Sequence, residues 1–212
     1  MTTLLSTTYF GPIQWYQKLY RAEEVQIEQW ESFQKQTYRN RCLIATTNGI
    51  QALTVPVERD IVQSSVFKYI KDLRISDHGN WRHLHWNALQ SAYGESPFFD
   101  YYQDDLRPFF EKRWEFLFDF NEAICHTICE LLDIQPTISY TKEYLPESLL
   151  ITHHSSLITS YRDTIHPKHP PPDPDFTPKP YYQVYQQKHG FLPNLSILDL
   201  LFNMGHEAIF FL

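Results

Sequence analysis

The sequence predicts a mixed α/β (α+β) fold with a β-rich N-terminal third, a helical middle and a short C-terminal helix after a proline-rich loop. Short β-branched and aromatic runs fill the first third, and longer segments with helical spacing follow. Seven of the fourteen prolines then fall between residues 167 and 180. We expect one domain over residues 1–212, in which residues 165–181 form a surface loop or linker.

The first strand is expected within residues 2–10, where β-branched and aromatic residues precede Gly11 and Pro12. Proline is favoured in a first helical turn, so a helix should begin at Pro12. Its spacing predicts that one face is buried. The residues of that face are Ile13, Tyr16, Leu19 and Tyr20.

Three further segments of the N-terminal third are predicted to be extended. Residues 24–30 alternate as a strand does. Residues 41–57 are predicted to be two strands joined at Asn48-Gly49, because both residues tolerate positive φ. Residues 70–76 alternate apolar with charged side chains and are predicted to be a half-buried strand.

The middle of the chain is predicted to be helical. One helix should run from Asn80 to Gly94, a second should be interrupted at Pro108, and a third should span residues 114–132. A returning strand is expected at residues 136–141. The third helix is amphipathic.

Three side chains of that helix, Glu122, His126 and Glu130, share one face, and they could in principle bind a metal. Nothing nearby completes a coordination set, so a solvated stripe is the favoured interpretation. Neither a metal nor a cofactor is expected.

Composition excludes several classes of partner and location. The net charge of −7 argues against a nucleic-acid surface. Three cysteines without metal-finger spacing fit a reduced, cytoplasmic protein. No apolar run approaches the roughly 20 residues of a membrane span. Nothing in the sequence indicates an oligomeric state.

A cluster of cations precedes the predicted hairpin. If residues 41–46 form a strand, Arg39 and Arg41 point to one side and Asn40 to the other, with Lys35 upstream. Two arginine side chains on one face could bind a phosphate or carboxylate. Charges at the entrance of a strand could equally protect a sheet edge. The spacing alone does not decide between these alternatives.

Two further patterns admit a catalytic and a structural interpretation. His85 could be a general base, but a histidine on an apolar helical face is more often a hydrogen-bonded core residue. Ser196 and Asp199 could be a catalytic pair, but their spacing before an apolar run favours a helix cap. No glycine-rich phosphate loop, G-x-S-x-G or H-E-x-x-H motif occurs.

Several segments occur in a characteristic order: STTYFGPIQWYQKL, KQTYRNRCLI, LTVPVE, IKDLRI, NWRHLHW, SPFFDYY and FLPNLSILDLLFNMG. Through them the sequence resembles the shorter branch of the WbqC-like protein family over residues 5–140 and 181–212. The usual family opening has His or Ser followed by Gln-Pro, whereas this chain has Ser6-Thr7-Thr8.

The resemblance implies an uncharacterised protein of bacterial surface-polysaccharide (O-antigen) metabolism, and a transferase of aminoacyl or glycyl groups to an amino sugar has been suggested for the family. The expected partner is an anionic small molecule, a nucleotide sugar or an acyl donor. On this hypothesis His85 is the general base, and the family pattern favours a substrate-binding role for the cation cluster. The expected substrate-binding residues are Tyr9, Lys35, Tyr38, Arg39, Asn40, Arg41 and Trp81.

Two competing predictions remain. A non-catalytic ligand- or partner-binding protein would use the high aromatic content and the tyrosines that flank the proline segment. A purely structural subunit would pair the arginines with Asp104, Asp105 or Glu111.

Overall fold

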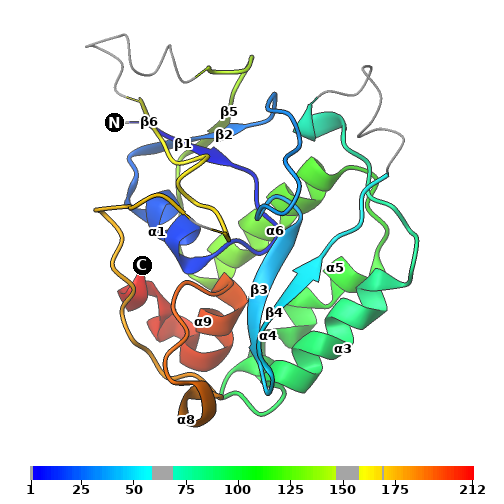
Figure 1. Ribbon diagram of the computed structural model, residues 1–212, viewed down its shortest axis with the longest axis vertical. Helices are drawn as coiled ribbons and strands as arrows, with labels where there is room; N and C mark the ends of the chain where they lie inside the picture. Colours follow the sequence, from blue (N-terminus) through cyan, green and yellow to red (C-terminus); the bar gives the residue numbers. More distant parts are fainter. Residues whose placement is uncertain (1, 59–68, 147–157, 169) are drawn as a thin grey trace.

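The computed structural model describes residues 2–58, 69–146, 158–168 and 170–212 (Figure 1). A four-stranded parallel sheet has the strand order β5-β2-β1-β6. Its strands are β1 (Thr2–Ser6), β2 (Glu24–Glu28), β5 (Ile138–Tyr140) and β6 (Ile158–Ser160). The predicted mixed fold is confirmed, with most strands in the N-terminal third and helices in the middle of the chain.

β1 and β2 are joined by α1 (Ile13–Arg21), and both strands begin where the sequence predicts strands. Adjacent residues of β1 point to opposite faces, and Leu4 and Leu5 are both fully buried, as expected for a sheet covered on both sides. α1 buries three of the four predicted residues. Tyr20 is the exception, because its side chain is 44% exposed.

The predicted hairpin is confirmed: β3 (Arg41–Thr46) and β4 (Gly49–Thr54) pair antiparallel, and they run down the middle of the molecule (Figure 1). The turn lies one residue earlier than expected, since Gly49 already pairs with Thr46 and only Thr47 and Asn48 connect the strands. Gly49 alone supplies a positive φ, of 100°.

The predicted strand at residues 70–76 is wrong. Ile70–Asp72 form a 3₁₀ helix, η1, and the segment that follows makes only isolated bridges, Val57 to Ile75 and Arg74 to Phe116. The alternating side chains are explained by burial alone. Leu73 and Ile75 are buried in the core, although the segment does not pair with a continuous strand.

The helical middle is confirmed, including the break at Pro108. Helices α3, α4 and α5 lie together beside the hairpin, and α9 lies near α1 (Figure 1). The helices are α3 (Trp81–Tyr93), α4 (Phe99–Leu106), α5 (Pro108–Glu111), α6 (Leu117–Leu131), α8 (Gln186–His189), α9 (Ile197–Met204) and the 3₁₀ helix η2 (Gly205–Phe211).

The solvated stripe predicted on α6 is wrong at one position. Glu122 is only 8% exposed, whereas His126 and Glu130 are exposed as expected. Thr7 Oγ1, in the loop after β1, donates a hydrogen bond to Glu122 Oε1 at 3.0 Å. Packing against this loop therefore covers a carboxyl group that the helical period alone places toward solvent.

The proline-rich segment forms neither helix nor strand in its described part, and most of these residues are exposed. Several polar contacts attach the segment to the rest of the protein. Lys18 Nζ lies 2.9 Å from Asp173 Oδ2, and the Tyr181 hydroxyl donates to Asp199 Oδ1 at 2.6 Å.

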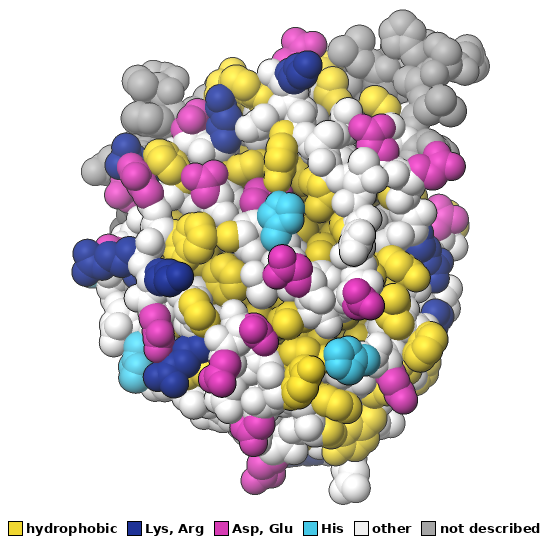
Figure 2. Space-filling model, turned by 180° about the vertical axis from the view of Figure 1, so that it is seen from behind, with side chains coloured by type: hydrophobic (Ala, Val, Ile, Leu, Met, Phe, Trp, Pro, Cys, Tyr) yellow, Lys and Arg dark blue, Asp and Glu magenta, His cyan; other side chains and the backbone are white. Residues whose placement is uncertain are grey.

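The surface seen from behind mixes acidic, basic and apolar side chains (Figure 2). Among the helices of the described residues, none has the length and apolar character needed to cross a lipid bilayer.

Candidate functional site

The order of the parallel strands indicates where a ligand would bind, at the edge of the sheet formed by the carboxyl ends of its strands. From β1 the chain continues to β2 and then β5 on one side, whereas β6 pairs with the other side of β1. In open α/β sheets such a reversal opens a crevice at the carboxyl ends of the strands, and ligands bind there. The residues that follow β1, β2 and β6 are therefore the first candidates for a site.

A cavity of about 350 Å³ lies at this edge, and we call it the edge cavity. Its wall includes Trp30, Glu31, Tyr69, Tyr144, Arg162 and Asp163. The rings of Trp30 and Tyr69 meet edge to face with centroids 5.2 Å apart. The Arg162 guanidinium lies over the Tyr144 ring at 5.1 Å. The wall thus combines aromatic surface with both signs of charge.

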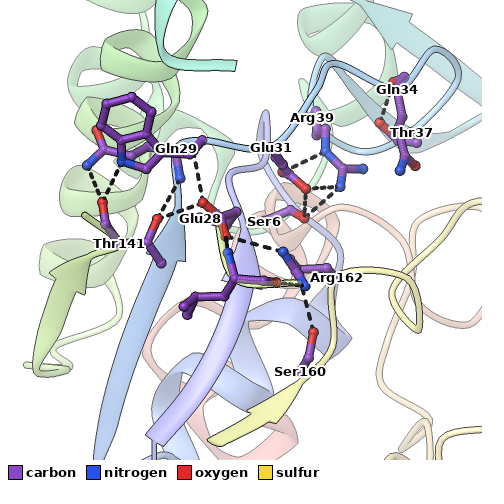
Figure 3. A network of polar contacts seen from close by, with 12 residues as sticks. Ser6, Glu28, Gln29, Glu31, Gln34, Thr37, Arg39, Thr141, Ser160 and Arg162 are labelled. Atoms are coloured by element: carbon purple, nitrogen blue, oxygen red, sulfur yellow. Dashed lines mark hydrogen bonds and ion pairs between the residues drawn. The ribbon is translucent and has the colours of Figure 1, made fainter. Parts of the chain in front are cut away.

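A buried ion pair lies beside the edge cavity (Figure 3). Arg39 Nε donates to Glu31 Oε1 at 2.7 Å, and Arg39 Nη2 donates both to Glu31 Oε2 and to Ser6 Oγ. Ser6 Oγ in turn donates to Glu31 Oε2 at 3.2 Å. Because Arg39 is 3% exposed and Glu31 5%, the two charges neutralise each other away from bulk water.

A second buried pair, Arg162 and Glu28, lies on the same edge (Figure 3). Arg162 Nη1 lies 3.2 Å from Glu28 Oε2, and Arg162 Nη2 donates to the Leu145 carbonyl at 2.6 Å. Thr141 Oγ1 and the Trp30 amide both donate to Glu28 Oε1. The residues after β2, β5 and β6 are therefore joined into one polar network.

A smaller crevice of about 10 Å³ lies at the reversal of strand order. Ser6, the last residue of β1, and the next two residues, Thr7 and Thr8, line it together with Arg39 and Arg162. Thr7 connects this crevice to Glu122. Burial disfavours the charged carboxylate and raises the pKa of Glu122 to about 7, although the hydrogen bond from Thr7 opposes the shift.

His85, the predicted general base, lies in the core between aromatic rings. It is 6% exposed, its Nδ1 lies 2.9 Å from the Tyr9 hydroxyl, and the Trp81 ring centroid is 5.2 Å away. Burial disfavours the imidazolium and lowers the pKa of His85 to about 4, while the backbone of Thr54 opposes the shift. The imidazole is therefore neutral near pH 7.

The other predicted substrate-binding residues lie in several environments. Tyr9, Tyr38, Asn40 and Trp81 are all buried. Tyr38 accepts a hydrogen bond from the Tyr9 amide through its carbonyl, Asn40 Nδ2 donates to the Val55 carbonyl, and Trp81 Nε1 donates to the Ser76 carbonyl. Each is held by the protein itself, and a substrate-binding role for these side chains stays a prediction.

The three cations of the predicted cluster lie in different environments. Lys35 is exposed, Arg41 is partly buried at the first residue of β3, and Arg39 is buried against Glu31. Arg39 and Tyr38 line the small crevice, whereas none of the predicted site residues lines the edge cavity.

The capping interpretation of Ser196 is confirmed. Ser196 Oγ accepts from the Leu198 amide at 3.3 Å and donates to the Phe10 carbonyl at 2.8 Å. Asp199 has a different role from the one expected: it is fully buried and accepts from the hydroxyls of Tyr93 and Tyr181. Burial raises the pKa of Asp199, and these hydrogen bonds oppose the shift.

Sequence reasoning missed the carboxylates and Arg162 of the sheet edge. Ser6 and Glu28 lie within segments predicted to be strands, but the parallel pairing that makes the ends of β1 and β2 a candidate site is known only from the structure. Arg162 gave no signal, since β6 was not predicted. In the part of the chain that the structure describes, no three His, Cys, Asp or Glu side chains come together as a metal site.

Comparison with known proteins gives two matches. A family model described as "WbqC-like protein family" matches residues 7–164 and 173–210. The chain is 28% identical over 192 residues to a protein of Mycobacterium tuberculosis named "Uncharacterized protein Rv1507c". This match covers 83% of this chain and 81% of the relative. No solved structure matches.

Proposed function

Because the chain belongs to the WbqC-like protein family, we propose that it is a transferase that moves an aminoacyl or glycyl group onto an amino sugar in bacterial surface-polysaccharide metabolism. The amino sugar would bind in the edge cavity. The observation that supports this proposal most is the wall of the cavity, in which aromatic rings and carboxylates surround about 350 Å³ at the carboxyl edge of a parallel sheet.

The aromatic wall suits a sugar ring. Trp30, Tyr69 and Tyr144 offer flat apolar surface of the kind that contacts the C–H face of a pyranose, and Tyr144 is 48% exposed. Glu31 also lines the cavity, and hydrogen bonds from Arg39 and Ser6 hold its carboxylate in one position.

The charges of the wall suit an amine and an anion. Asp163 is exposed and presents a carboxylate to which the ammonium of an amino sugar can bind. Arg162 is the cation of the same wall, and the phosphate or carboxylate of a nucleotide sugar or acyl donor would bind beside it.

In the proposed reaction the amine nitrogen forms a bond to the carbonyl carbon of the donor. The bond from that carbon to the leaving group breaks, and the leaving group keeps the bonding electrons. Before the attack the ammonium loses one proton to the Asp163 carboxylate, which frees the lone pair of the nitrogen, and after the attack its second proton passes to the leaving group. This proposal does not depend on His85, whose role as general base stays a prediction.

Binding of glucosamine and of UDP-linked amino sugars, measured by isothermal titration calorimetry, tests the proposal. Asp163→Asn should weaken binding by about tenfold, which corresponds to one charge-assisted hydrogen bond. Tyr144→Ala should also weaken binding, whereas Tyr101→Ala is the control, because Tyr101 of α4 is also exposed (63%, against 48% for Tyr144) and does not line the cavity. Glucose lacks the amine and should bind as weakly to the wild type as glucosamine binds to Asp163→Asn. Absence of binding to the wild type would contradict the proposal.

A second candidate is a non-catalytic binding protein that uses the same cavity. It is favoured by the observation that His85 is neutral and buried and that both arginines of the edge are paired with glutamates. A transfer assay with radiolabelled glycine donors separates the two candidates. Binding of the amino sugar without any labelled product would favour the non-catalytic protein.

A further inference from the structure

A second hollow, of about 360 Å³, lies where α3 begins beside α5. We call it the arginine hollow, because Arg82, Arg107 and Arg113 all line it. None of its lining residues belongs to the edge cavity. In Figure 2 the side of the molecule that carries α3 and α5 is at the left, where Lys and Arg side chains lie among Asp and Glu side chains. We propose that the arginine hollow binds a phosphate-bearing small molecule.

The charges of the hollow favour an anion. Two carboxylates, Asp77 and Glu111, line it beside the three arginines, which leaves one positive charge in excess. Arg82 Nη1 lies 2.7 Å from Asp77 Oδ1, and Arg107 Nε lies 2.6 Å from Glu111 Oε1. Arg113 makes only a longer contact, 3.5 Å to Asp77 Oδ2. A local excess of positive charge is notable in a chain with a net charge of −7.

Arg82 is incompletely satisfied by the protein. Its Nε and Nη2 atoms are buried and have no hydrogen-bond partner, although its side chain lines the hollow and is 13% exposed. A buried guanidinium nitrogen without a partner costs free energy, so a rotation of Arg82 that turns these atoms from the Trp81 ring toward a bound oxyanion would remove this cost. Arg107 and Arg113 are 56% and 83% exposed, and both can reorient toward a bound anion.

The first turn of α3 supports the same ligand class. Asn80, which precedes the helix and lines the hollow, has φ 44°, and its side chain makes no capping hydrogen bond. The first turn contains no acidic residue. Uncapped amides and the positive end of the helix dipole both favour an anion at this position.

The apolar part of the hollow fits the remainder of such a molecule. Trp86 and Phe110 line it, with ring centroids 5.5 Å apart. A ligand whose phosphate contacts the arginines would place its organic part against these rings. The arginines and the aromatic rings together fit a small phosphorylated metabolite. Its phosphate group would contact the arginines, and this contact can be tested with simple phosphates.

Pyrophosphate and inorganic phosphate are the probes, titrated at constant ionic strength and followed by ¹H–¹⁵N NMR. We expect saturable shifts in the amides of Arg82 and His83 and in the indole of Trp86. The double variant Arg107→Gln/Arg113→Gln should bind pyrophosphate at least about tenfold more weakly, since it lacks two charged donors. Both arginines are exposed, so the variant should fold.

Arg74→Gln is the matched control, because Arg74 is also an exposed, ion-paired arginine but does not line the hollow. It should bind as the wild type does. Absence of shifts at α3 with millimolar pyrophosphate, or unchanged affinity in the double variant, would overturn the proposal. The indole of Trp30, which lines the edge cavity, reports on that cavity separately, so pyrophosphate bound there is distinguished from pyrophosphate bound in the arginine hollow.

Discussion

Glu122 lies on α6 with its carboxyl group turned toward the loop after β1, where Thr7 Oγ1 donates to it at 3.0 Å. Its pKa is raised to about 7 because burial disfavours the charged form. The unfolded chain exposes this carboxyl group, so its pKa there is close to the ordinary value of 4.5. Between these two pKa values the native state binds more protons than the unfolded state.

The free energy of unfolding should therefore fall as the pH rises from about 4.5 to about 7, by on the order of 3 kcal/mol from Glu122 alone. Glu122→Gln should remove this contribution, because the amide oxygen still accepts from Thr7 and does not ionise. Urea unfolding on both sides of this pH interval measures the difference. His85 titrates in both proteins, so its effect cancels in the comparison.

The control is Glu130→Gln, an exposed glutamate on the same helix, which should keep the wild-type pH dependence. If Glu122→Gln also keeps it, the carboxyl group of Glu122 is not the group that loses its proton in this interval.

At the scale of the elements, the β3–β4 hairpin depends on one glycine. Gly49 has φ 100°, and a Cβ atom placed on it would contact nothing within 4 Å. Its role is therefore conformational, because the backbone angle excludes other residues while the surrounding space does not. Asn48 is the adjacent turn residue, and its φ is not positive.

Gly49→Ala should destabilise the protein by about 1–2 kcal/mol, the cost of a positive φ for an L-residue. Asn48→Ala should cost less, since its backbone angle suits alanine. Urea unfolding of both variants checks this difference. An equal loss in the two variants would mean that the turn does not depend on the left-handed backbone of Gly49.

At the scale of the whole molecule, the Glu31–Arg39 pair connects three parts of the chain. Glu31 follows β2, Arg39 precedes β3, and Ser6, which contacts both, ends β1. A buried charge that loses its partner is costly, whereas a buried pair replaced as a whole need not be.

Glu31→Gln and Arg39→Met should each lower the free energy of unfolding by about 3–5 kcal/mol, because each leaves one buried charge unpaired. The double variant should lose less than the sum of the two losses. A double-mutant cycle by chemical denaturation measures this coupling, and additive losses would contradict it. The exposed pair Arg107–Glu111 is the control, with an expected coupling below about 1 kcal/mol.

Local sequence determined much of the architecture. The hairpin follows from Gly49, the start of α1 from Pro12, the break before α5 from Pro108, and the beginning of α9 from Ser196. Each of these depends on the conformational preference of one or two residues and on neighbours within one turn. Such preferences act over a few residues, so the turns and helix ends that depend on them can be predicted from the sequence.

Tertiary structure alone decided where the charges lie. Arg39 pairs with Glu31 and not with the carboxylates of the helical middle, and Arg162 meets Glu28 across 134 residues of sequence. Glu122 is buried although its helical position indicated solvent. The free energy of a charge depends on whether distant segments exclude water from it and supply a partner. The order of the parallel strands determines which segments cover each charge and which residues pair with it. No local pattern in the sequence encodes that order.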